Sequence, residues 1–498
     1  MDRKGNDLDP HIRRFLIAAL LVGSLFPLWV ATRRHQFLND DTYITLTYAK
    51  SLAAGNGFVF NHAPATLGTT APLLTLIVAT LSALFPWIEP SLIAVLFTAA
   101  CWAGIVWVVF LFRRQLDLND WQATVMGLVI IASGWVDFLG MEAYLFALLL
   151  VLGVVLFYRR QWLLAGGSVG LLFLTRGEGI LMLPLLVAGS LIYTGRGGTV
   201  GKMIRPGLRI LAGFLVPALM WSVYSQLTFG RIIPNTLSVK MAQEQSGMWL
   251  SFPERLLEWI PLWERQFALG HRGILNIWWL LVAVGLGSAI IEKRRWLLFL
   301  AWMGMYVAGY TALQVAGYWW YQLPILFVLQ VFAALGLVRI TEAAARAMGR
   351  HRFAMRVAPV IIILPVLLLL IKPRVNRALT HPGDARAPSY LTLCRWFGDN
   401  TLPSQSIAYI EVGYLGYYTD NRIIDLSGLT TPDIVPHVAT GDFASGFWQH
   451  EPDFFVFLPD FGWALDEIRD GPQFDRLYQP VATLPGPREA EFVIYAHQ

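Results

Sequence analysis

Uninterrupted apolar runs recur along the chain from Phe15 to Ile371. A run of about 20 apolar residues is long enough to cross a bilayer as a helix. The runs are continuous rather than alternating, which favours helices over a β-barrel as the structure that satisfies the backbone within lipid. The sequence therefore predicts a mainly α, polytopic membrane protein.

Charged residues are few, and their placement indicates topology. They make up 14% of the 498 residues, whereas a soluble domain carries about 25%. Much of the Arg and Lys lies in short loops, so the net charge of +5 reflects membrane orientation rather than nucleic-acid binding. Cys101 lies inside an apolar run, in a different region from Cys394, which argues against a structural disulfide. No small-residue cleavage site follows the first run, so we expect it to be retained as a helix.

Basic residues predict which loops face the cytoplasm. His11–Arg14 precede the first run, so we expect the N-terminus inside and the following loop outside. Twelve runs can be counted, but a cytoplasmic start and an outer C-terminal segment require an odd number. Either the run at 73–85 does not fully cross, or the pair Arg113-Arg114 breaks the charge rule. We expect about 11–13 transmembrane helices in a plasma (inner) membrane protein.

The composition changes after Ile371, where Asp, Pro, Gly and other polar residues become frequent. We assign residues 1–371 to a transmembrane catalytic domain with its first outer loop at 32–70. Residues 372–498 are assigned to a small α/β domain outside the cytoplasm. Three short apolar segments predict strands in this domain, at Ser406–Ile410, Phe454–Leu458 and Phe492–Tyr495.

Asp40 and Asp41 are adjacent carboxylates directly after the first apolar run. Ionisable residues are costly near a membrane, which makes them functional candidates by default. The alternative is that one of them caps a helix from Thr42 to Ala54, ended by Gly55. The pattern of that helix predicts an amphipathic segment lying in the membrane interface. Both interpretations can hold, because a cap fixes a carboxylate in space.

Further polar groups are predicted at outer helix ends. They are Glu142, Arg176 with Glu178, Arg231, and Asn235 with Lys240. The alternatives are an ion pair between Arg176 and Glu178, and lysine or arginine side chains that reach to lipid head groups. A face that carries both charges suits glycosyl transfer from a lipid phosphate. A cation would neutralise the leaving phosphate, and a carboxylate would take the proton of an attacking hydroxyl.

The chain resembles the GT-C superfamily of polytopic glycosyltransferases, and within it the bacterial arabinofuranosyltransferase-type enzymes that use a polyprenyl-phosphate sugar. The matching pieces keep their order and span most of the chain. They are Asn39–Ile44 with Ala49, Gly55–Asn61, Gly140–Glu142, Leu174–Gly179, Pro234–Thr236 with Lys240, Gly413–Tyr418 and Ile424–Leu429. Leu67-Gly68 replaces a Glu-Gly pair that is frequent in the family, and Arg176-Gly177-Glu178 replaces an Arg-Pro-Glu. These departures concern the sugar and the acceptor more than the reaction class.

The resemblance implies roles for individual residues. In GT-C enzymes the first outer loop carries the catalytic Asp, so Asp40 is predicted as general base, with Asp41 orienting the sugar or the base. Lys240 and Arg176 are predicted to bind the donor phosphate. The predicted sugar- or acceptor-binding residues are Glu142, Glu178, Asn235 and Tyr43. No His and carboxylate spacing marks a metal site.

The resemblance also implies the partners and the location. The donor would be a polyprenyl-phosphate sugar, and no other cofactor is predicted. The acceptor would be a hydroxyl of a cell-envelope glycan, lipid or protein at the outer (periplasmic) face. Membrane lipids are further partners, and nucleic acid is not. Two alternatives are a lipid or glycan transporter (flippase) without transfer activity, and a non-catalytic scaffold whose outer domain binds glycan. A transporter predicts polar groups near helix midpoints and broken helices in matching halves.

Overall fold

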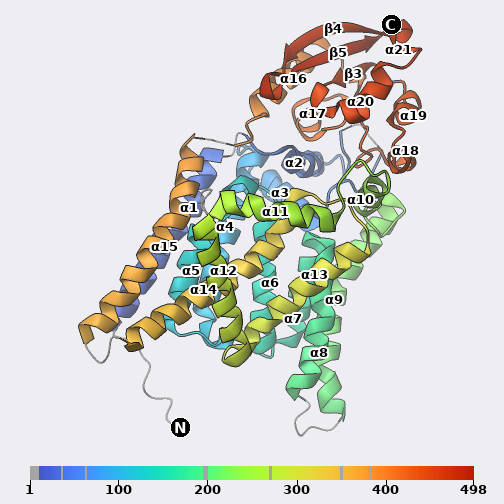
Figure 1. Cartoon of the computed structure of the whole chain (residues 1–498). Helices are drawn as coiled ribbons and strands as arrows, with labels where there is room; N and C mark the ends of the chain where they lie inside the picture. Colours follow the sequence, from blue (N-terminus) through green and yellow to red (C-terminus); the bar gives the residue numbers. More distant parts are fainter. Residues whose placement is uncertain are drawn as a thin grey trace.

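The computed structural model describes residues 10–34, 37–61, 64–194, 200–267, 272–347, 352–380 and 383–498. A bundle of helices carries a small sheet-containing domain at one end (Figure 1). The predicted class, a mainly helical polytopic protein with a small C-terminal α/β region, is confirmed.

The bundle consists of the apolar runs other than 73–85, each folded largely as a helix. Its helices are α1 (Pro10–Arg34), α4 (Pro90–Leu111), α5 (Asp120–Ala132), α6 (Ala143–Tyr158), α7 (Trp162–Thr175), α8 (Met182–Thr194), α9 (Val200–Phe229), α12 (Arg272–Ile291), α13 (Leu297–Ala312), α14 (Gln322–Ala347) and α15 (Arg352–Thr380). By length and composition, five helices of the described residues can cross a membrane, and others are shorter but apolar. The chain is an integral membrane protein.

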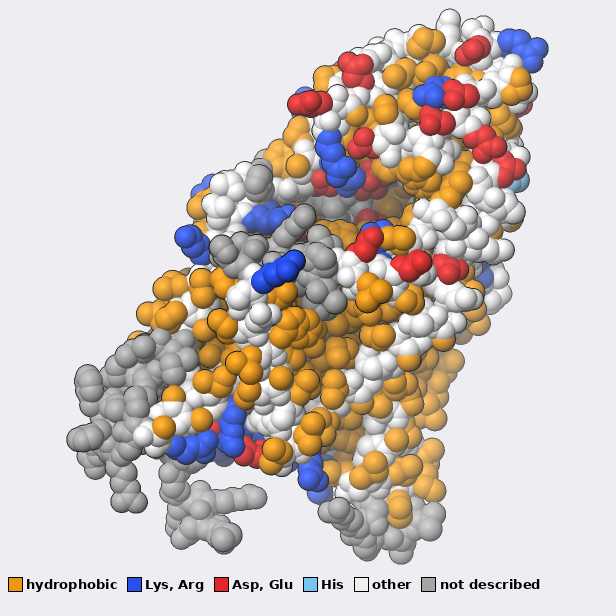
Figure 2. All heavy atoms as spheres, in the orientation of Figure 1, with side chains coloured by type: hydrophobic (Ala, Val, Ile, Leu, Met, Phe, Trp, Pro, Cys, Tyr) orange, Lys and Arg blue, Asp and Glu red, His pale blue; other side chains and the backbone are white. Residues whose placement is uncertain are grey.

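The flank of the bundle is apolar. Figure 2 shows hydrophobic side chains over the helices and basic side chains at the end opposite the sheet domain. On α9, Leu219 and Met220 are 54% and 71% exposed. An apolar surface of this kind is expected to face lipid rather than water.

Close backbone contact joins α12 to α14. A first side-chain carbon added at Gly285 would lie 1.8 Å from the carbonyl oxygen of Phe332. One added at Gly336 would lie 1.9 Å from the carbonyl oxygen of Leu281. Small residues allow such an approach in membranes, where packing rather than water exclusion holds helices together.

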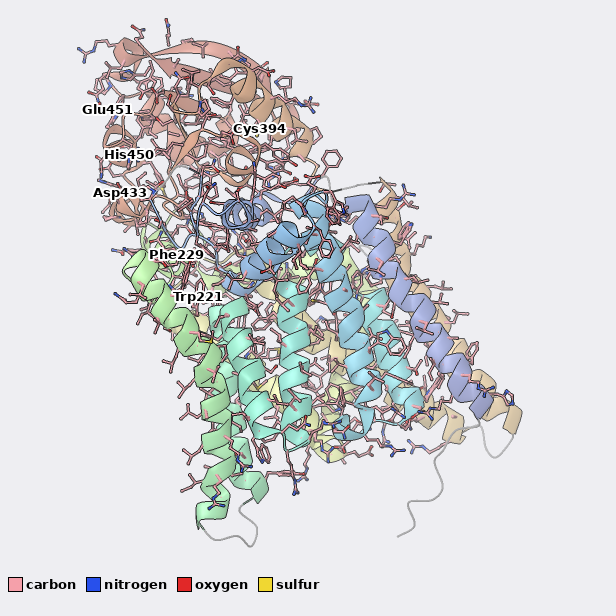
Figure 3. All side chains as sticks on the ribbon, turned by 180° about the vertical axis from the view of Figure 1, so that it is seen from behind. Trp221, Phe229, Cys394, Asp433, His450 and Glu451 are labelled. Carbon is pink, nitrogen blue, oxygen red and sulfur yellow. The ribbon has the colours of Figure 1, made fainter. Side chains whose placement is uncertain are left out.

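Four further helices lie at the end of the bundle that carries the sheet domain (Figure 1). They are α2 (Asp40–Ala53), α3 (Pro72–Leu84), α10 (Asn235–Gln245) and α11 (Phe252–Phe267). Figures 1 and 3 both show α3 beside α2, below that domain. The run at 73–85 therefore lies at the end of the bundle, which favours the first of the two alternatives, that it does not fully cross.

The structure corrects two expectations for α2. Its N-cap is Asn39, whose Oδ1 accepts from the backbone N–H of Thr42 at 2.9 Å, so neither Asp40 nor Asp41 is the cap. The helix is also largely buried rather than interfacial, because α3 and the C-terminal domain cover it. The predicted stop is confirmed: Gly55 follows the helix with a φ of 82°.

The C-terminal domain is built on five strands. They are β1 (Ser406–Tyr409), β2 (Arg422–Asp425), β3 (Phe454–Phe457), β4 (Tyr478–Pro485) and β5 (Glu491–His497), in the order β2-β1-β3-β5-β4. β1 runs parallel to β2 and β3, whereas β5 is antiparallel to β3 and β4. The three predicted strands correspond to β1, β3 and β5, and the sequence analysis did not find β2 and β4.

Short helices surround this sheet. They are α16 (Ala387–Asn400), α17 (Gly413–Tyr418), α18 (Val435–Thr440), α19 (Phe443–Trp448), α20 (Gly462–Arg469) and α21 (Phe474–Leu477). Cys394 lies in α16 (Figure 3), and Cys101 lies in α4; both are free and buried. Figure 3 also labels Trp221 and Phe229 of α9, which ends near the domain. Both rings pack on Phe58 of the loop after α2.

Candidate active site

A small polar cavity of about 30 Å³ opens between the bundle and the C-terminal domain. Its lining comes from α2, the segments before α3 and α6, α10, the short helix η5 (Trp319–Tyr321) and the loop after β2. The residues are Asp41, Ile44, Thr45, Gly68, Thr69, Thr70, Met141, Glu142, Lys240, Trp320, Tyr321 and Leu429. It is lined by two carboxylates and one ammonium group.

Lys240 supplies the positive charge of this cavity. Its Nζ lies 3.3 Å from the ring centroid of Tyr318, and it makes no hydrogen bond or ion pair with the described residues. A cation over an aromatic face is stabilised by up to about 2 kcal/mol when desolvated. Burial lowers the pKa of Lys240 to about 7, while Asp41 and Asp425 oppose this fall. The ring of Tyr318 thus holds the ammonium in place, and its N–H groups remain available to bind an anion.

Asp41 faces the same cavity from α2. Burial raises the pKa of Asp41 to about 6, and the charge of Lys240 limits the rise. Asp41 lies on α2 and Lys240 on α10, and neither helix is among those long and apolar enough to cross a membrane. A carboxylate with such a pKa is mostly ionised at neutral pH yet basic enough to accept a proton, which suits a general base.

Asp40 points elsewhere. Its two carboxylate oxygens accept backbone N–H bonds from Gly413 and Tyr414, each at 3.0 Å. Burial raises the pKa of Asp40 well above its ordinary value, Glu411 and Asp41 add to the rise, and the two backbone bonds oppose it. Asp40 thus joins α2 to the start of α17, outside the cavity lining.

Glu142 belongs to a buried ion cluster behind the cavity. Arg176 donates from Nη1 to Glu142 at 2.9 Å and from Nε to Glu178, which also accepts from the hydroxyl of Tyr310 at 3.1 Å. The expected pair between Arg176 and Glu178 therefore exists, and Glu142 completes it. Both carboxylates engage the guanidinium, so the structure places Arg176 behind Glu142 rather than on the polar cavity.

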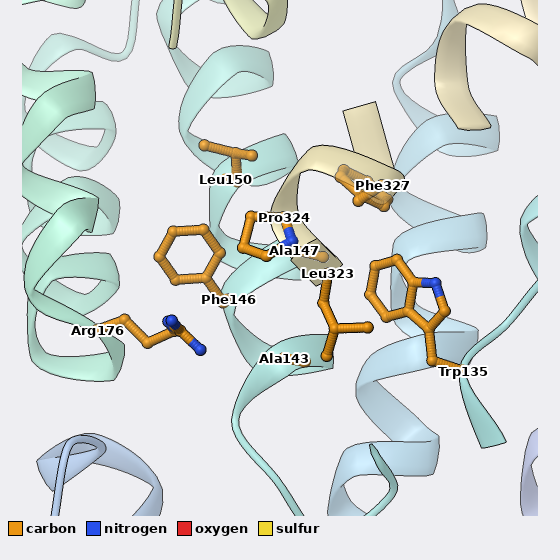
Figure 4. Close-up of a pocket in the computed structure, with 9 residues that line it drawn as sticks. All are labelled: Trp135, Ala143, Phe146, Ala147, Leu150, Arg176, Leu323, Pro324 and Phe327. Carbon is orange, nitrogen blue, oxygen red and sulfur yellow. The ribbon is translucent and has the colours of Figure 1, made fainter. Parts of the chain in front are cut away.

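Arg176 instead borders a second, apolar pocket (Figure 4). Phe146, Trp135 and Leu323 are among the residues around it. The polar cavity and this pocket share neither a wall residue nor the same chemistry. Arg176 therefore supports Glu142 from the apolar side.

A glycine sets the direction of Glu142. Gly140 has a φ of 92°, and its N–H donates to Thr98 Oγ1 at 2.9 Å. A residue with a side chain is disfavoured there, because L-residues rarely adopt positive φ. The turn leads Met141 and Glu142 into the cavity wall ahead of α6.

Two other predicted binding residues lie outside the cavity lining. Tyr43 packs on the rings of Tyr414, Tyr417 and Tyr418, and its hydroxyl lies 3.0 Å from that of Tyr418. Asn235 is 1% exposed and donates through Nδ2 to backbone oxygens of the loop after β2. Both residues connect the bundle to the C-terminal domain.

The structure adds cavity residues that the sequence analysis did not select. Thr45 and Thr69 bring their hydroxyl oxygens within 3.0 Å of each other, and Leu429 reaches in from the C-terminal domain. Trp320 and Tyr321 of η5 also line the cavity, and their rings pack edge to face. No single motif in the sequence marks these residues as part of a site. Only their position relative to Gly68 and Lys240 could have suggested it. Among the described residues, no group of three His, Cys, Asp or Glu is placed to hold a metal ion.

Comparison with known proteins supports the fold. Residues 383–495 match the model of a domain of unknown function (DUF8728). No curated protein matches the sequence. ArnT from Cupriavidus metallidurans is similar in its crystal structure bound to undecaprenyl phosphate. That likeness has a TM-score of 0.62 at 14% identity, over 97% of this chain and 98% of ArnT.

Two other structures extend this likeness. The apo state of ArnT has a TM-score of 0.62 at 15% identity, over 96% of this chain and 97% of ArnT. A mutant of the arabinofuranosyltransferase AftD from Mycobacteria has a TM-score of 0.54 at 15% identity. It covers 99% of this chain and 42% of AftD. The structural likeness covers nearly the whole chain, which therefore has the GT-C fold that the sequence motifs predicted.

Proposed function

We propose that this protein is a membrane glycosyltransferase that moves a sugar from a polyprenyl-phosphate donor to a hydroxyl group. One observation carries the proposal: Asp41 and Lys240 face one cavity, and the ammonium of Lys240, which lies over the ring of Tyr318, makes no hydrogen bond or ion pair with the described residues. A base and a phosphate-binding cation are the two groups that this reaction needs. The similarity in fold to ArnT bound to undecaprenyl phosphate supports the class of donor.

In the proposed reaction the acceptor oxygen attacks the anomeric carbon of the sugar. The bond between that carbon and the phosphate oxygen breaks, and polyprenyl phosphate leaves with both electrons of the bond. Asp41 takes the proton of the acceptor hydroxyl. Lys240 stabilises the charge that develops on the phosphate, and the low dielectric of the cavity strengthens this attraction.

The other predicted residues take supporting roles in this proposal. Glu142, held by Arg176, lies on the cavity and is the candidate for binding hydroxyls of the sugar or acceptor. Asp40 positions α2 against α17 instead of acting as the base, since both of its oxygens accept backbone bonds. Arg176 acts through Glu142 rather than on the phosphate itself. An arabinofuranosyl donor, an envelope acceptor and action at the outer face belong to the same proposal.

A transporter or flippase is the second candidate. It predicts polar sites near the middle of the membrane helices. The acid and base groups here gather at the end of the bundle beside the C-terminal domain, which favours transfer over transport. A non-catalytic scaffold offers no reason to oppose Asp41 and Lys240 across one cavity.

The test uses purified full-length protein and undecaprenyl-phosphate sugars labelled in the sugar. Release of undecaprenyl phosphate with transfer of label to an alkyl glycoside is expected for the wild type. Lys240→Ala should weaken donor binding and slow transfer, and Lys240→Arg should restore only part, because a planar fork replaces a point charge.

Arg231→Ala is the matched control, because Arg231 is an exposed cation near the same helix start. It should retain the wild-type rate. Equal and small effects of Lys240→Ala and Arg231→Ala would contradict the phosphate assignment. Movement of intact donor across a vesicle membrane without release of undecaprenyl phosphate would favour the transporter.

A further inference from the structure

The C-terminal domain reaches the polar cavity through one loop. We call residues 425–431, which follow β2, the cavity loop. Leu429 of this loop lines the cavity, and all the other lining residues come from the part of the chain before residue 322. It is a half-buried, apolar side chain in a wall that also carries Asp41 and Lys240.

Internal hydrogen bonds fix the shape of the cavity loop. Asp425 is fully buried, and its Oδ1 accepts from the N–H and the hydroxyl of Ser427 at 2.8 and 2.6 Å. Its Oδ2 accepts from the N–H of Thr430 at 2.9 Å, and its own N–H donates to Thr431 Oγ1 at 2.9 Å. A buried carboxylate with every contact satisfied makes a rigid loop rather than a mobile one.

The bundle fixes the position of this loop. Asn235 donates from Nδ2 to the carbonyl oxygens of Gly428 and Leu429, at 2.8 and 3.0 Å. At Gly68, an added side-chain carbon would lie 2.8 Å from the Leu429 oxygen and 2.7 Å from the Tyr48 hydroxyl. The loop therefore sits directly on the segment before α3, at Gly68.

We propose that Leu429 is a specificity-determining residue that keeps water away from the reacting sugar, and that Asn235 positions it. The inference rests on the proposed function. Water can replace the acceptor hydroxyl, so that the donor would be hydrolysed to free sugar and polyprenyl phosphate with the proton again going to Asp41. An apolar side chain at this point of the polar wall disfavours that side reaction by occupying space in which water would otherwise lie beside the sugar.

The first experiment measures how the donor is divided between two products. Undecaprenyl-phosphate arabinofuranose labelled in the sugar is the donor, and octyl glycosides are the acceptors. Leu429→Ala should raise the ratio of free sugar to transferred sugar several-fold, and Leu429→Met should restore a ratio near that of the wild type. Leu402→Ala, at an exposed leucine of the same domain, should leave the ratio unchanged.

The same ratio separates positioning from folding. Asn235→Ala should also raise the ratio of hydrolysis to transfer, because Leu429 loses the bonds that hold it. A variant that merely folds poorly would lower both products together and leave their ratio at the wild-type value. That result for both Leu429→Ala and Asn235→Ala would overturn the inference.

The second experiment needs no turnover. Leu429→Cys is treated with a maleimide with and without undecaprenyl phosphate; the two native cysteines are buried. With undecaprenyl phosphate at about ten times its Kd, modification should slow about tenfold, since about one molecule in eleven stays free. Thr440→Cys, at an exposed site of the same domain, should react at one rate in both conditions.

The failures of the two proposals differ. Binding of undecaprenyl phosphate and normal transfer, with Leu429→Cys unprotected and the product ratio of Leu429→Ala unchanged, would overturn the role of Leu429 and leave the function standing. A wild type that neither binds undecaprenyl phosphate nor releases it from any labelled donor would overturn both.

Discussion

At the residue scale, the neighbouring carboxylates Asp40 and Asp41 point in different directions, because they are consecutive residues of one helix. Consecutive side chains on an α-helix point about 100° apart. Asp41 therefore faces the cavity while Asp40 faces α17, where it accepts two backbone bonds. Asp40 attaches the C-terminal domain, and Asp41 lies on the cavity, where we propose that it acts as the base, although a sequence motif shows them as one pair.

Asp41→Asn and Asp40→Asn should therefore fail in different ways. Asp41→Asn removes the proposed base and should lower kcat by roughly 10²- to 10⁴-fold at an unchanged melting temperature. Asp40→Asn replaces one acceptor oxygen by a donor that faces a backbone N–H. It should destabilise the protein by about 1–3 kcal/mol, the cost of an unsatisfied buried group.

Turnover and thermal unfolding measured on both variants check this assignment. The opposite pattern would return the role of base to Asp40: loss of turnover in a stable Asp40→Asn protein, with near-normal transfer by Asp41→Asn. Asp41→Glu is a useful companion, because it keeps the charge but moves the carboxylate by one methylene.

The pH dependence of transfer follows from the same two groups. Asp41, with a pKa of about 6, must lose its proton to act as base, so kcat/KM should rise as pH increases through that value. Lys240, with a pKa of about 7, must keep its proton to bind phosphate, so kcat/KM should fall above that value. The profile should be bell-shaped, with its optimum between the two limbs.

Donor binding should move the alkaline limb of this profile. A phosphate anion beside Lys240 favours the ammonium form, so the fall in kcat should occur at higher pH than the fall in kcat/KM. Rates measured across pH at saturating and limiting donor give both profiles. A descending limb that stays in place in Lys240→Arg would indicate that another group is responsible, because arginine does not titrate in this range.

At the element scale, α2 is where the bundle, the cavity and the C-terminal domain meet. Its sequence predicted a cap, a helix and a stop, and the helix lies within a residue or two of the expected ends. The burial of α2 was not predictable from its own pattern, because it depends on α17, whose residues lie more than 350 positions later. Local signals define such an element, whereas its surroundings come from distant parts of the chain.

The close packing of α12 on α14 depends on Gly285 and Gly336. The sequence alone does not indicate that these two glycines lie at one contact. Gly285→Ala should lower the thermal stability of the detergent-solubilised protein by about 1–3 kcal/mol or more, because the methyl group meets the Phe332 carbonyl. Gly287→Ala is the matched control on the same helix, since an added carbon there meets nothing within 4 Å. Equal melting temperatures for the two variants would contradict the close approach of these helices.

At the scale of the whole molecule, the sequence predicted the class of fold and the three charged residues that line the cavity, Asp41, Glu142 and Lys240, but not the contacts around them. Apolar runs and their order along the chain suffice to predict a helical membrane protein, and the short strands suffice to predict a small α/β unit. The pairing of Arg176 with Glu142 and the entry of Leu429 into the cavity are different. Each joins segments separated by tens to hundreds of residues, and no periodicity or motif length encodes such contacts.

The orientation of the molecule in the membrane is the last expectation to test. Basic loops such as Arg113-Arg114 and Arg294-Arg295 lie opposite the C-terminal domain, and basic residues mark the cytoplasmic side of membrane proteins. The domain and the cavity below it should then face outward. Thr440→Cys should react with a membrane-impermeant maleimide in intact spheroplasts, and Arg159→Cys, at the other end of the bundle, only after lysis. The native cysteines are buried and should contribute little background. Reaction of Arg159→Cys but not Thr440→Cys before lysis would place the cavity in the cytoplasm and require a donor presented on that face.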